Sequence, residues 1–266
     1  MNKFLFLVTL FLFLSFTKVD FAKDKTPQQQ NEFEVGEELV YSVKYTFIKL
    51  GEIRFKVLEK KTENGKTFYR ITININSEES IPFVDLHEIY ESYYNIGNYS
   101  DLFKATHRTK EYFRFSEHKF DYENKKIYVK KGTLKPYFVE IDSTCDLRHS
   151  FNDGLSLFYY ARIMSGIHHK ETVHCFINEQ KVKAVINFND KVENINIDAV
   201  DYEIGCVKLN GNAEFKGVFG LSGDFEGWFT NDKYKVPVLA KLSVIIGNIT
   251  VELISWRKKG WKPPKY

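Results

Sequence analysis

Hydrophobic and polar residues alternate along most of the chain, which is the pattern of half-buried β-strands. Residues 39–47 and 53–57 show this period of two, and Lys49-Leu50-Gly51 between them predicts a hairpin. Asn64-Gly65 predicts a second tight turn, because both central positions of such a turn favour positive φ. The alternation resumes beyond it at residues 71–76.

The same alternation continues to the end of the chain. Further strands are expected at residues 87–96, 103–115, 126–130, 137–141, 172–177, 182–188, 192–200, 206–209, 213–219, 225–229, 236–246 and 249–256. Short strands that recur at roughly 8–12 residues, with Gly or Asn turns between them, favour an antiparallel sandwich or barrel-like sheet. A second helical period is absent from the sequence pattern, which disfavours a parallel α/β fold.

One stretch, residues 152–166, departs from this pattern and predicts a helix. Asn152 or Asp153 can cap its start, because a short side-chain oxygen accepts a backbone N–H that the first turn leaves free. Gly166 can end it in the left-handed conformation. Apolar side chains cover nearly every side of this cylinder: Leu155, Leu157, Phe158, Tyr159, Tyr160, Ile163 and Met164.

A helix that is apolar all round must be buried. The sequence therefore predicts an all-β, mainly antiparallel fold, in which a curved or spiral, open barrel-like sheet wraps around one buried helix at about residues 153–165.

The two ends of the chain differ from its middle. Residues 1–22 resemble an export signal, with Lys3 followed by a short apolar run that is too short to span a bilayer. The cleavage site is poorly defined, so retention as an uncleaved anchor stays an alternative. Residues 23–32 are polar and predict a flexible leader. Residues 33–256 then form a single expected β domain.

The last residues, 257–266, form a basic tail with a Pro-Pro pair. One interpretation is a disordered, solvated end. The other is peripheral contact with an anionic membrane surface, with Trp261 at the headgroup level. No cysteine follows the apolar run at the N-terminus, which argues against a lipid anchor. These features predict an exported protein of the periplasm with no transmembrane helix in the mature chain.

Net charge and cysteine content indicate which partners and which cysteine states to expect. The formal net charge of the 266 residues is +3, with Lys and Glu interleaved, so a nucleic-acid partner is not expected. Export places Cys145, Cys175 and Cys206 in an oxidising compartment. The odd number allows one disulfide in three pairings, or unpaired thiols that pack as small hydrophobic residues.

The chain is rich in aromatic residues, with 24 Phe and 16 Tyr, and these suggest a candidate interior. The residues expected to line it are Tyr41, Tyr45, Phe47, Phe55, Tyr93, Leu155, Phe158 and Tyr159. They either fill a packed core or surround an apolar cavity suited to an acyl chain. A closed apolar void of roughly 300 Å³ or more beside Leu155, Phe158 and Tyr159 favours ligand binding, and a filled interior favours a structural role.

The sequence contains only partial matches to catalytic and metal-binding motifs. Gly220-Leu221-Ser222-Gly223-Asp224 resembles a nucleophile elbow, but Asp224 stands where that motif needs glycine. Ser116-Glu117-His118-Lys119 matches Ser-x-x-Lys without the companion motifs of that enzyme class. His168, His169, His174 and Cys175 are the densest set of metal-ligand types, but neighbouring strand residues point to opposite faces. No catalytic residue, metal ligand or cofactor is therefore assigned.

Several stretches together are similar to one family. Phe33-Glu34-Val35-Gly36-Glu37-Glu38-Leu39-Val40-Tyr41 and Ile48-Lys49-Leu50-Gly51-Glu52 resemble the opening of the bacterial exported family called domain of unknown function 3108. Asn152-Asp153-Gly154-Leu155-Ser156, with Tyr159-Tyr160 and Arg162, is similar to its central helix motif. Val236-Pro237-Val238 and residues 246–253 resemble its closing hairpin. The resemblance implies an exported, strand-rich protein with a sheet wrapped on a helix, and it brings no catalytic residues.

The sequence thus predicts a non-enzymatic periplasmic or cell-envelope protein that binds a hydrophobic ligand, such as a lipid or lipoprotein, or an envelope partner. The alternative is a structural or assembly protein that docks through exposed strand edges or the basic tail. A metal-dependent hydrolase that uses the region of residues 168–174 is the third possibility.

Overall fold

The computed structural model describes residues 33–81, 85–108, 113–213, 223–244 and 247–266. All of these belong to the compact unit Asn31–Tyr266. The expected signal peptide at residues 1–22, the leader at 23–32 and the Ser222 of the elbow-like motif lie outside the described residues. Among the described residues, none of the helices is long and apolar enough to cross a membrane.

Strands make up most of the described chain. The first arm contains β1 (Glu38–Tyr45), β2 (Ile48–Glu63), β3 (Lys66–Ser77), β4 (His87–Asn95), β5 (Tyr99–Arg108), β6 (Phe113–Asp121), β7 (Lys126–Leu134) and β8 (Tyr137–Asp146). The helix α1 (Gly154–Met164) follows. The second arm contains β9 (His169–Ile177), β10 (Gln180–Ile195), β11 (Ile204–Ala213), β12 (Gly223–Thr230), β13 (Pro237–Ser243) and β14 (Asn248–Arg257).

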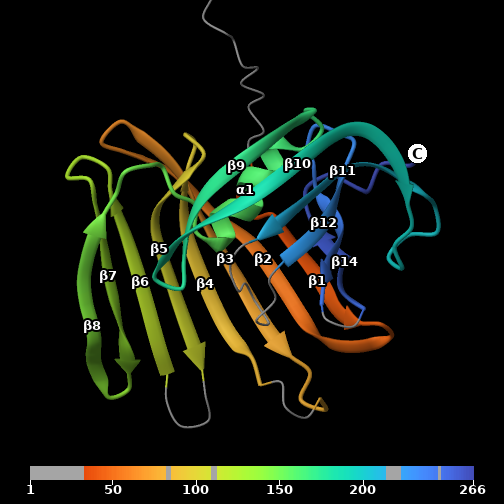
Figure 1. The fold of residues 1–266 in the computed structure, drawn as a ribbon. Helices are drawn as coiled ribbons and strands as arrows, with labels where there is room; N and C mark the ends of the chain where they lie inside the picture. The colour runs from red at the N-terminus through yellow and green to blue at the C-terminus, as the bar shows by residue number, and fades with distance from the viewer. Residues whose placement is uncertain (1–32, 82–84, 109–112, 214–222, 245–246) are drawn as a thin grey trace, which may run out of the picture. The chain divides into compact units, whose positions relative to one another are not determined.

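These strands form one antiparallel sheet in the order β8-β7-β6-β5-β4-β3-β2-β1-β14-β13-β12-β11-β10-β9. The first and last strands, β1 and β14, pair in the middle of the sheet, and β8 and β9 are its edges. The segment with α1 connects one edge to the other, where Asn152 and Cys175 form an isolated parallel bridge. The sheet is therefore open (Figure 1), and the predicted all-β, open barrel-like fold is confirmed.

The turns follow from local sequence. Asn64 and Gly65, between β2 and β3, have φ of 50° and 73°, as the predicted tight turn requires. The first hairpin pairs Tyr41 with Ile53 and Leu39 with Phe55, so their side chains share one face of the sheet.

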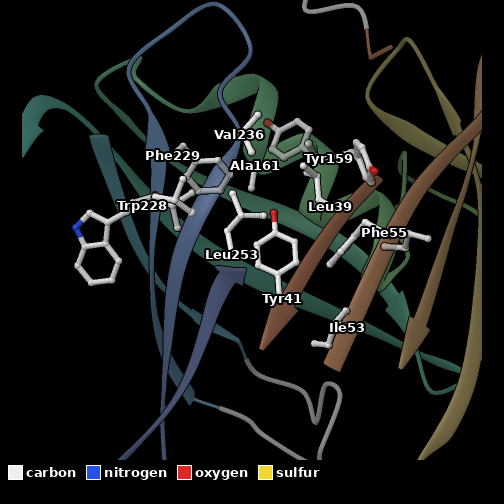
Figure 2. Close-up of a cluster of buried hydrophobic side chains, with 14 of the residues drawn as sticks. Leu39, Tyr41, Ile53, Phe55, Tyr159, Ala161, Trp228, Phe229, Val236 and Leu253 are labelled. Carbon is white, nitrogen blue, oxygen red and sulfur yellow. The ribbon is translucent and has the colours of Figure 1, made fainter. Parts of the chain in front are cut away.

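The helix covers that face. Tyr41 and Phe55 point toward the side of the sheet where Tyr159 and Ala161 of α1 lie (Figure 2). Tyr159 is fully buried, and its ring packs edge-on against Phe33 with 4.7 Å between ring centroids. Gly166, just beyond the helix, has φ +81°, which is the left-handed conformation expected of a residue that ends a helix. The predicted buried helix is confirmed.

A second apolar cluster joins the two edges of the sheet. Phe176 of β9 packs in T-shaped geometry against Phe120 of β6, with ring centroids 6.0 Å apart. Ile127 and Val129 of β7, together with Leu147 and Phe151, complete the cluster. Side-chain packing rather than backbone pairing thus holds β9 against β6 and β7.

Strand boundaries differ from the sequence expectation at several places. The expected strand at 206–209 extends to Ala213 in β11, and residues 214–219 of the strand expected at 213–219 lie outside the described residues. The expected strand at residues 103–115 covers parts of both β5 and β6. The sequence predicts separate strands at 182–188 and 192–200, but all of the first and residues 192–195 of the second belong to β10, which has a register shift between Phe188 and Val192. Periodicity locates alternation but does not show where one strand passes into the next.

The expectation of a disordered tail at residues 257–266 is wrong. Trp261 is 5% exposed, and its indole N–H donates to Asp232 at 2.7 Å. Trp256 donates to the carbonyl of Trp261, and the Tyr266 amide donates to the carbonyl of Glu203 at 2.8 Å. Burial of a large aromatic ring whose N–H is hydrogen-bonded stabilises the fold, and this explains why the tail packs against the domain. Trp261 is therefore packed against the domain and is not exposed at its surface.

Candidate ligand-binding site

Asp153 fixes the start of α1 to the sheet. Its Oδ1 accepts the backbone N–H groups of Leu155 and Ser156 at 2.7 and 2.8 Å. Its Oδ2 accepts the hydroxyls of Ser92 on β4 and Ser100 on β5, both at 2.6 Å. Burial raises the pKa of Asp153, while these four donors act in the opposite direction. Any shift of the helix start would leave buried polar groups unsatisfied.

The last turn of α1 is held by a buried ion cluster. Arg162 Nη2 donates to Glu37 Oε2 at 3.0 Å, and Arg162 Nε donates to the carbonyl of Tyr234 at 3.0 Å. Lys258 Nζ lies 2.8 Å from Glu37 Oε2. Burial alone would raise the pKa of Glu37, but Arg162 and Lys258 together hold it below its ordinary value. The cluster ties α1 to the segments before β1 and after β14.

Between these two anchors, α1 and the sheet line a partly open apolar cavity of about 310 Å³. Its wall is formed mainly by side chains of α1 and of strands from both arms, close to the β1–β14 pair. The residues include Tyr41, Ile53, Phe55, Ile73, Leu157, Phe158, Ala161, Ile186, Leu209, Phe225, Phe229, Leu239, Leu242 and Val251.

Polar groups at this cavity are already satisfied. The Tyr41 hydroxyl donates to the carbonyl of Pro237 at 2.8 Å, so its ring faces the cavity while its oxygen is occupied. Phe158 stacks on Phe55 with 4.3 Å between ring centroids. Glu226 is the charged residue of the wall, and it pairs with Lys208. The cavity therefore offers an occupant dispersion contacts and few hydrogen bonds.

A second cavity, of about 450 Å³, adjoins the first. The two share Ile73 of β3 and Gly154 and Leu157 of α1 as wall residues. Part of the wall of the second cavity is apolar and includes Tyr90, Phe103, Phe115, Leu155 and Phe176. Unlike the first cavity, it also has a cluster of polar and charged side chains, which is called the polar group below: Glu88, His107, Arg114, Ser116, His118, Lys131 and Glu179.

Glu179 organises that polar group. It lies in the turn between β9 and β10, where Asn178 and Glu179 both have positive φ, 51° and 59°. Its carboxylate accepts the Ser116 hydroxyl at 3.2 Å and Lys131 Nζ at 3.0 Å, and it lies 3.5 Å from Nε2 of the buried His118. The hydrogen bond from His118, followed by Lys131, lowers the pKa of Glu179 to about 2. The hairpin tip is thus latched onto β6 and β7.

This latch predicts a pH dependence. Because the pKa of Glu179 falls from 4.5 to about 2 on folding, its stabilising contribution is complete above pH 4.5 and is lost as the pH falls toward 2. We expect Glu179→Gln to lower the free energy of unfolding by about 1 kcal/mol at pH 7, after discounting for solvent screening. Urea unfolding of both proteins between pH 7 and pH 3 measures the difference, which should shrink on acidification. A difference independent of pH would contradict the assignment.

The structure brings together most, but not all, of the expected lining residues. Tyr41, Phe55 and Phe158 line the apolar cavity, and Leu155 lines the second cavity. Tyr159 lies in the core behind them, and Tyr45 is half-buried against that core. Phe47 and Tyr93 lie outside this interior, which corrects the expectation that all eight residues share it.

Phe47 is 91% exposed in the turn between β1 and β2, because the turn takes it out of the alternation. Tyr93 packs on Phe68, with ring centroids 5.4 Å apart, whereas its neighbour Tyr94 is fully buried in the core. Successive strand residues point to opposite faces, so Tyr93 lies on the other side of the sheet.

The residues of the catalytic and metal motifs do not converge. Ser116 and Lys119 are three positions apart on β6, so their side chains leave opposite faces. His168 pairs with Asp190, and His169 Nδ1 contacts the Ile167 carbonyl at 2.7 Å. His174 stacks on His149. Within the described part of the chain, no group of three or more His, Cys, Asp or Glu side chains is arranged to hold a metal ion.

The three cysteines are free thiols in the structure. Cys175 and Cys206 are fully buried, and Cys145 is half-buried in the cluster that joins the sheet edges. Burial raises the pKa of the Cys175 and Cys206 thiols to about 12. Of the two alternatives, the structure shows unpaired thiols that pack as small hydrophobic residues.

Sequence reasoning missed the residues that hold the site together. Glu37, Lys258 and Glu179 stand among many other charged residues, and no pattern separates them. Arg162 carried a usable indication, because it is a charged residue within an otherwise apolar, buried helix. A buried charge requires a partner, so Arg162 could have indicated an acidic residue on a neighbouring element.

The fold and site define an open, barrel-like antiparallel sheet that wraps a helix and lines a partly open apolar cavity. The family described as "Protein of unknown function (DUF3108)" matches residues 40–254, which is most of the chain. The chain belongs to this family.

A search of curated proteins found no match. Among solved structures, the chain is similar to the "Beta-barrel-like Protein of Domain of Unknown Function DUF1849 from Brucella abortus". The TM-score is 0.51 at 10% sequence identity, and the match covers 84% of this chain and 97% of the other. At this identity the similarity concerns the fold alone.

Proposed function

We propose that this protein binds a hydrophobic ligand in the cell envelope and carries out no reaction on it. The observation that supports this proposal best is the apolar cavity of about 310 Å³ between α1 and the sheet. Its volume lies at the lower end of the range, roughly 300–1,000 Å³, that small-molecule sites occupy.

Two features of the cavity favour an occupant. The wall is almost entirely apolar, so the partly open cavity leaves hydrocarbon surface exposed to solvent. An acyl chain that covers the wall gains about 25 cal/mol for each Å² of apolar surface removed from water. The ion cluster at one end of α1 and the Asp153 cap at the other hold the wall in place without a ligand, so little ordering is needed on binding.

Filling the cavity should weaken binding. In Ala161→Phe the new ring projects from a wall residue of α1. If it displaces two methylene groups of a ligand, the loss of about 0.8 kcal/mol each corresponds to roughly tenfold weaker affinity. Titration with N-phenyl-1-naphthylamine, an uncharged dye that fluoresces in apolar surroundings, measures the affinity.

Ile163→Phe is the matched control, because residue 163 lies on the same helix but is not a wall residue of either cavity. It should bind the dye like the unmodified protein. Thermal unfolding of both variants separates blocking from misfolding. Equal dye affinity in all three folded proteins, or no dye binding at all, would count against the proposal.

The export part of the proposal rests on the sequence of residues 1–22, with its short apolar run behind Lys3. Intact mass measurement after expression in a bacterial host, combined with fractionation, tests it. We expect a mature chain in the periplasmic fraction that lacks the first 22 residues or a closely similar number. A full-length chain in the cytoplasm would argue against export.

A docking protein is the second candidate, and the edge strand β8 favours it. Tyr137 and Phe138 are 67% and 61% exposed there, and the outer backbone groups of an edge strand can pair with a strand from a partner. In this case Phe138→Lys would abolish partner association and leave dye binding unchanged, whereas Ala161→Phe would do the reverse.

A further inference from the structure

We propose that the ligand is a single-chain amphiphile with an acidic head, a carboxylate or a phosphate. The chain occupies the apolar cavity, and the head lies in the adjoining cavity near Lys131. This inference rests on the proposed function and specifies the chemical class of its ligand. It is carried by the junction of the two cavities and by their different chemistry.

The junction lies at the first turn of α1. Ile73, Gly154 and Leu157 belong to the walls of both cavities, so an elongated ligand can extend from one to the other. Gly154 has no positive φ, and a Cβ built on it would meet nothing within 4 Å. Neither backbone conformation nor close packing therefore requires glycine here. Its missing side chain leaves space where the two cavities meet.

The two cavities suit opposite ends of one molecule. The apolar cavity has a single charged wall residue, Glu226, which is paired with Lys208. The adjoining cavity contains two carboxylates, two permanent cations and two histidines. A fully apolar ligand would leave those charges facing hydrocarbon, which is unfavourable. A molecule with one polar end satisfies both environments.

The hydrogen-bond partners indicate the charge of that end. Glu88 already accepts from His107 Nδ1 at 3.0 Å and from the Tyr90 hydroxyl, while Glu179 accepts from Ser116 and Lys131. These carboxylates are therefore engaged by donors on the sheet.

Lys131, by contrast, has more hydrogen-bond donors than acceptors that engage them. An ammonium group carries three protons, and Glu179 takes one of them at 3.0 Å. The Lys131 side chain is 33% exposed, so it can turn protons toward the cavity. Arg114 of the same wall is already paired with Glu140, which leaves Lys131 as the cation that can contact a ligand. A head with several acceptor oxygens and a negative charge fits this arrangement better than an alcohol or an ammonium head.

The experiment compares 11-(dansylamino)undecanoic acid with its methyl ester, which has the same chain and no charge. We expect the unmodified protein to bind the acid about tenfold more tightly than the ester. Lys131→Gln should reduce this preference to about twofold or less, whereas Lys131→Arg, which keeps the charge, should retain most of it. Lys130→Gln is the matched control, since Lys130 is the adjacent β7 residue, is 49% exposed and faces Asp142; it should behave like the unmodified protein.

Two further measurements test where the ligand lies and whether its acidic head is a carboxylate or a phosphate. Gly154→Trp should weaken binding of the acid at least tenfold, and Gly154→Ala should not. Displacement of the bound dye by dodecanoate and by dodecyl phosphate then shows which acidic head is preferred.

The outcomes separate the two proposals. Equal affinity for acid and ester in the unmodified protein, or an unchanged preference in Lys131→Gln, would overturn the acidic head and leave hydrophobic binding intact. Failure of both probes to bind would overturn the hydrophobic ligand itself. Thermal unfolding of each variant identifies any loss that comes from misfolding, and Lys131→Arg then provides the decisive comparison.

Discussion

Replacing Arg162 by alanine should lower the free energy of unfolding by about 3–5 kcal/mol, because removal of one partner leaves a buried charge without full compensation. The Arg162 and Glu37 side chains are 2% and 1% exposed, and the substitution also frees the carbonyl of Tyr234. Urea unfolding at pH 7, followed by tryptophan fluorescence, measures the change.

Arg257→Ala is the control, since Arg257 is 78% exposed at the end of β14 and reaches only as near as 3.9 Å to Glu38. It should change the free energy of unfolding by less than about 0.5 kcal/mol. If Arg162→Ala cost no more than this control, the cluster would not be what holds the end of α1.

Replacing Asp153 by alanine should lower the free energy of unfolding by about 3 kcal/mol. Loss of the helix cap accounts for about 1 kcal/mol. The hydroxyls of Ser92 and Ser100, both fully buried, lose their acceptor and account for about 1 kcal/mol or more each. Urea unfolding measures this change, and circular dichroism shows whether the helix persists.

Asp153→Asn gives an intermediate comparison, because its carbonyl oxygen can still cap the helix while its amide replaces the second acceptor. Asp142→Ala, at a residue 66% exposed on β8, controls for loss of a surface carboxylate. A cost for Asp153→Ala equal to that of Asp142→Ala would show that the anchor to β4 and β5 does not stabilise the fold.

The fold was predictable because its signals are local. Alternation of apolar and polar positions located most of the strands, and Asn64-Gly65 marked a turn that the structure confirms. The helix at about residues 153–165 was evident from a continuous apolar surface between Asp153 and Gly166. Each of these patterns depends on neighbouring residues, whose relation is written directly in the sequence.

The site was less predictable because its contacts join distant positions. Arg162 and Glu37 are 125 positions apart, and Lys131 and Glu179 are 48 apart. The sequence around Trp261 predicts a solvated tail, because the residue that holds it in place, Asp232, is distant in sequence and lies in another loop. The prediction that Phe47 lines the interior was wrong for the opposite reason. Phe47 continues the alternation in sequence, but it lies in the turn after β1 and is exposed.

The central claim is that an acyl ligand lies between α1 and the sheet, and native mass spectrometry of the exported protein tests it most directly. Protein purified without detergent should carry an added mass in the range of a single-chain lipid, and a smaller fraction of Ala161→Phe, purified in the same way, should carry it. Repeated preparations without any bound mass, or an equal bound fraction in both proteins, would contradict a ligand at this position.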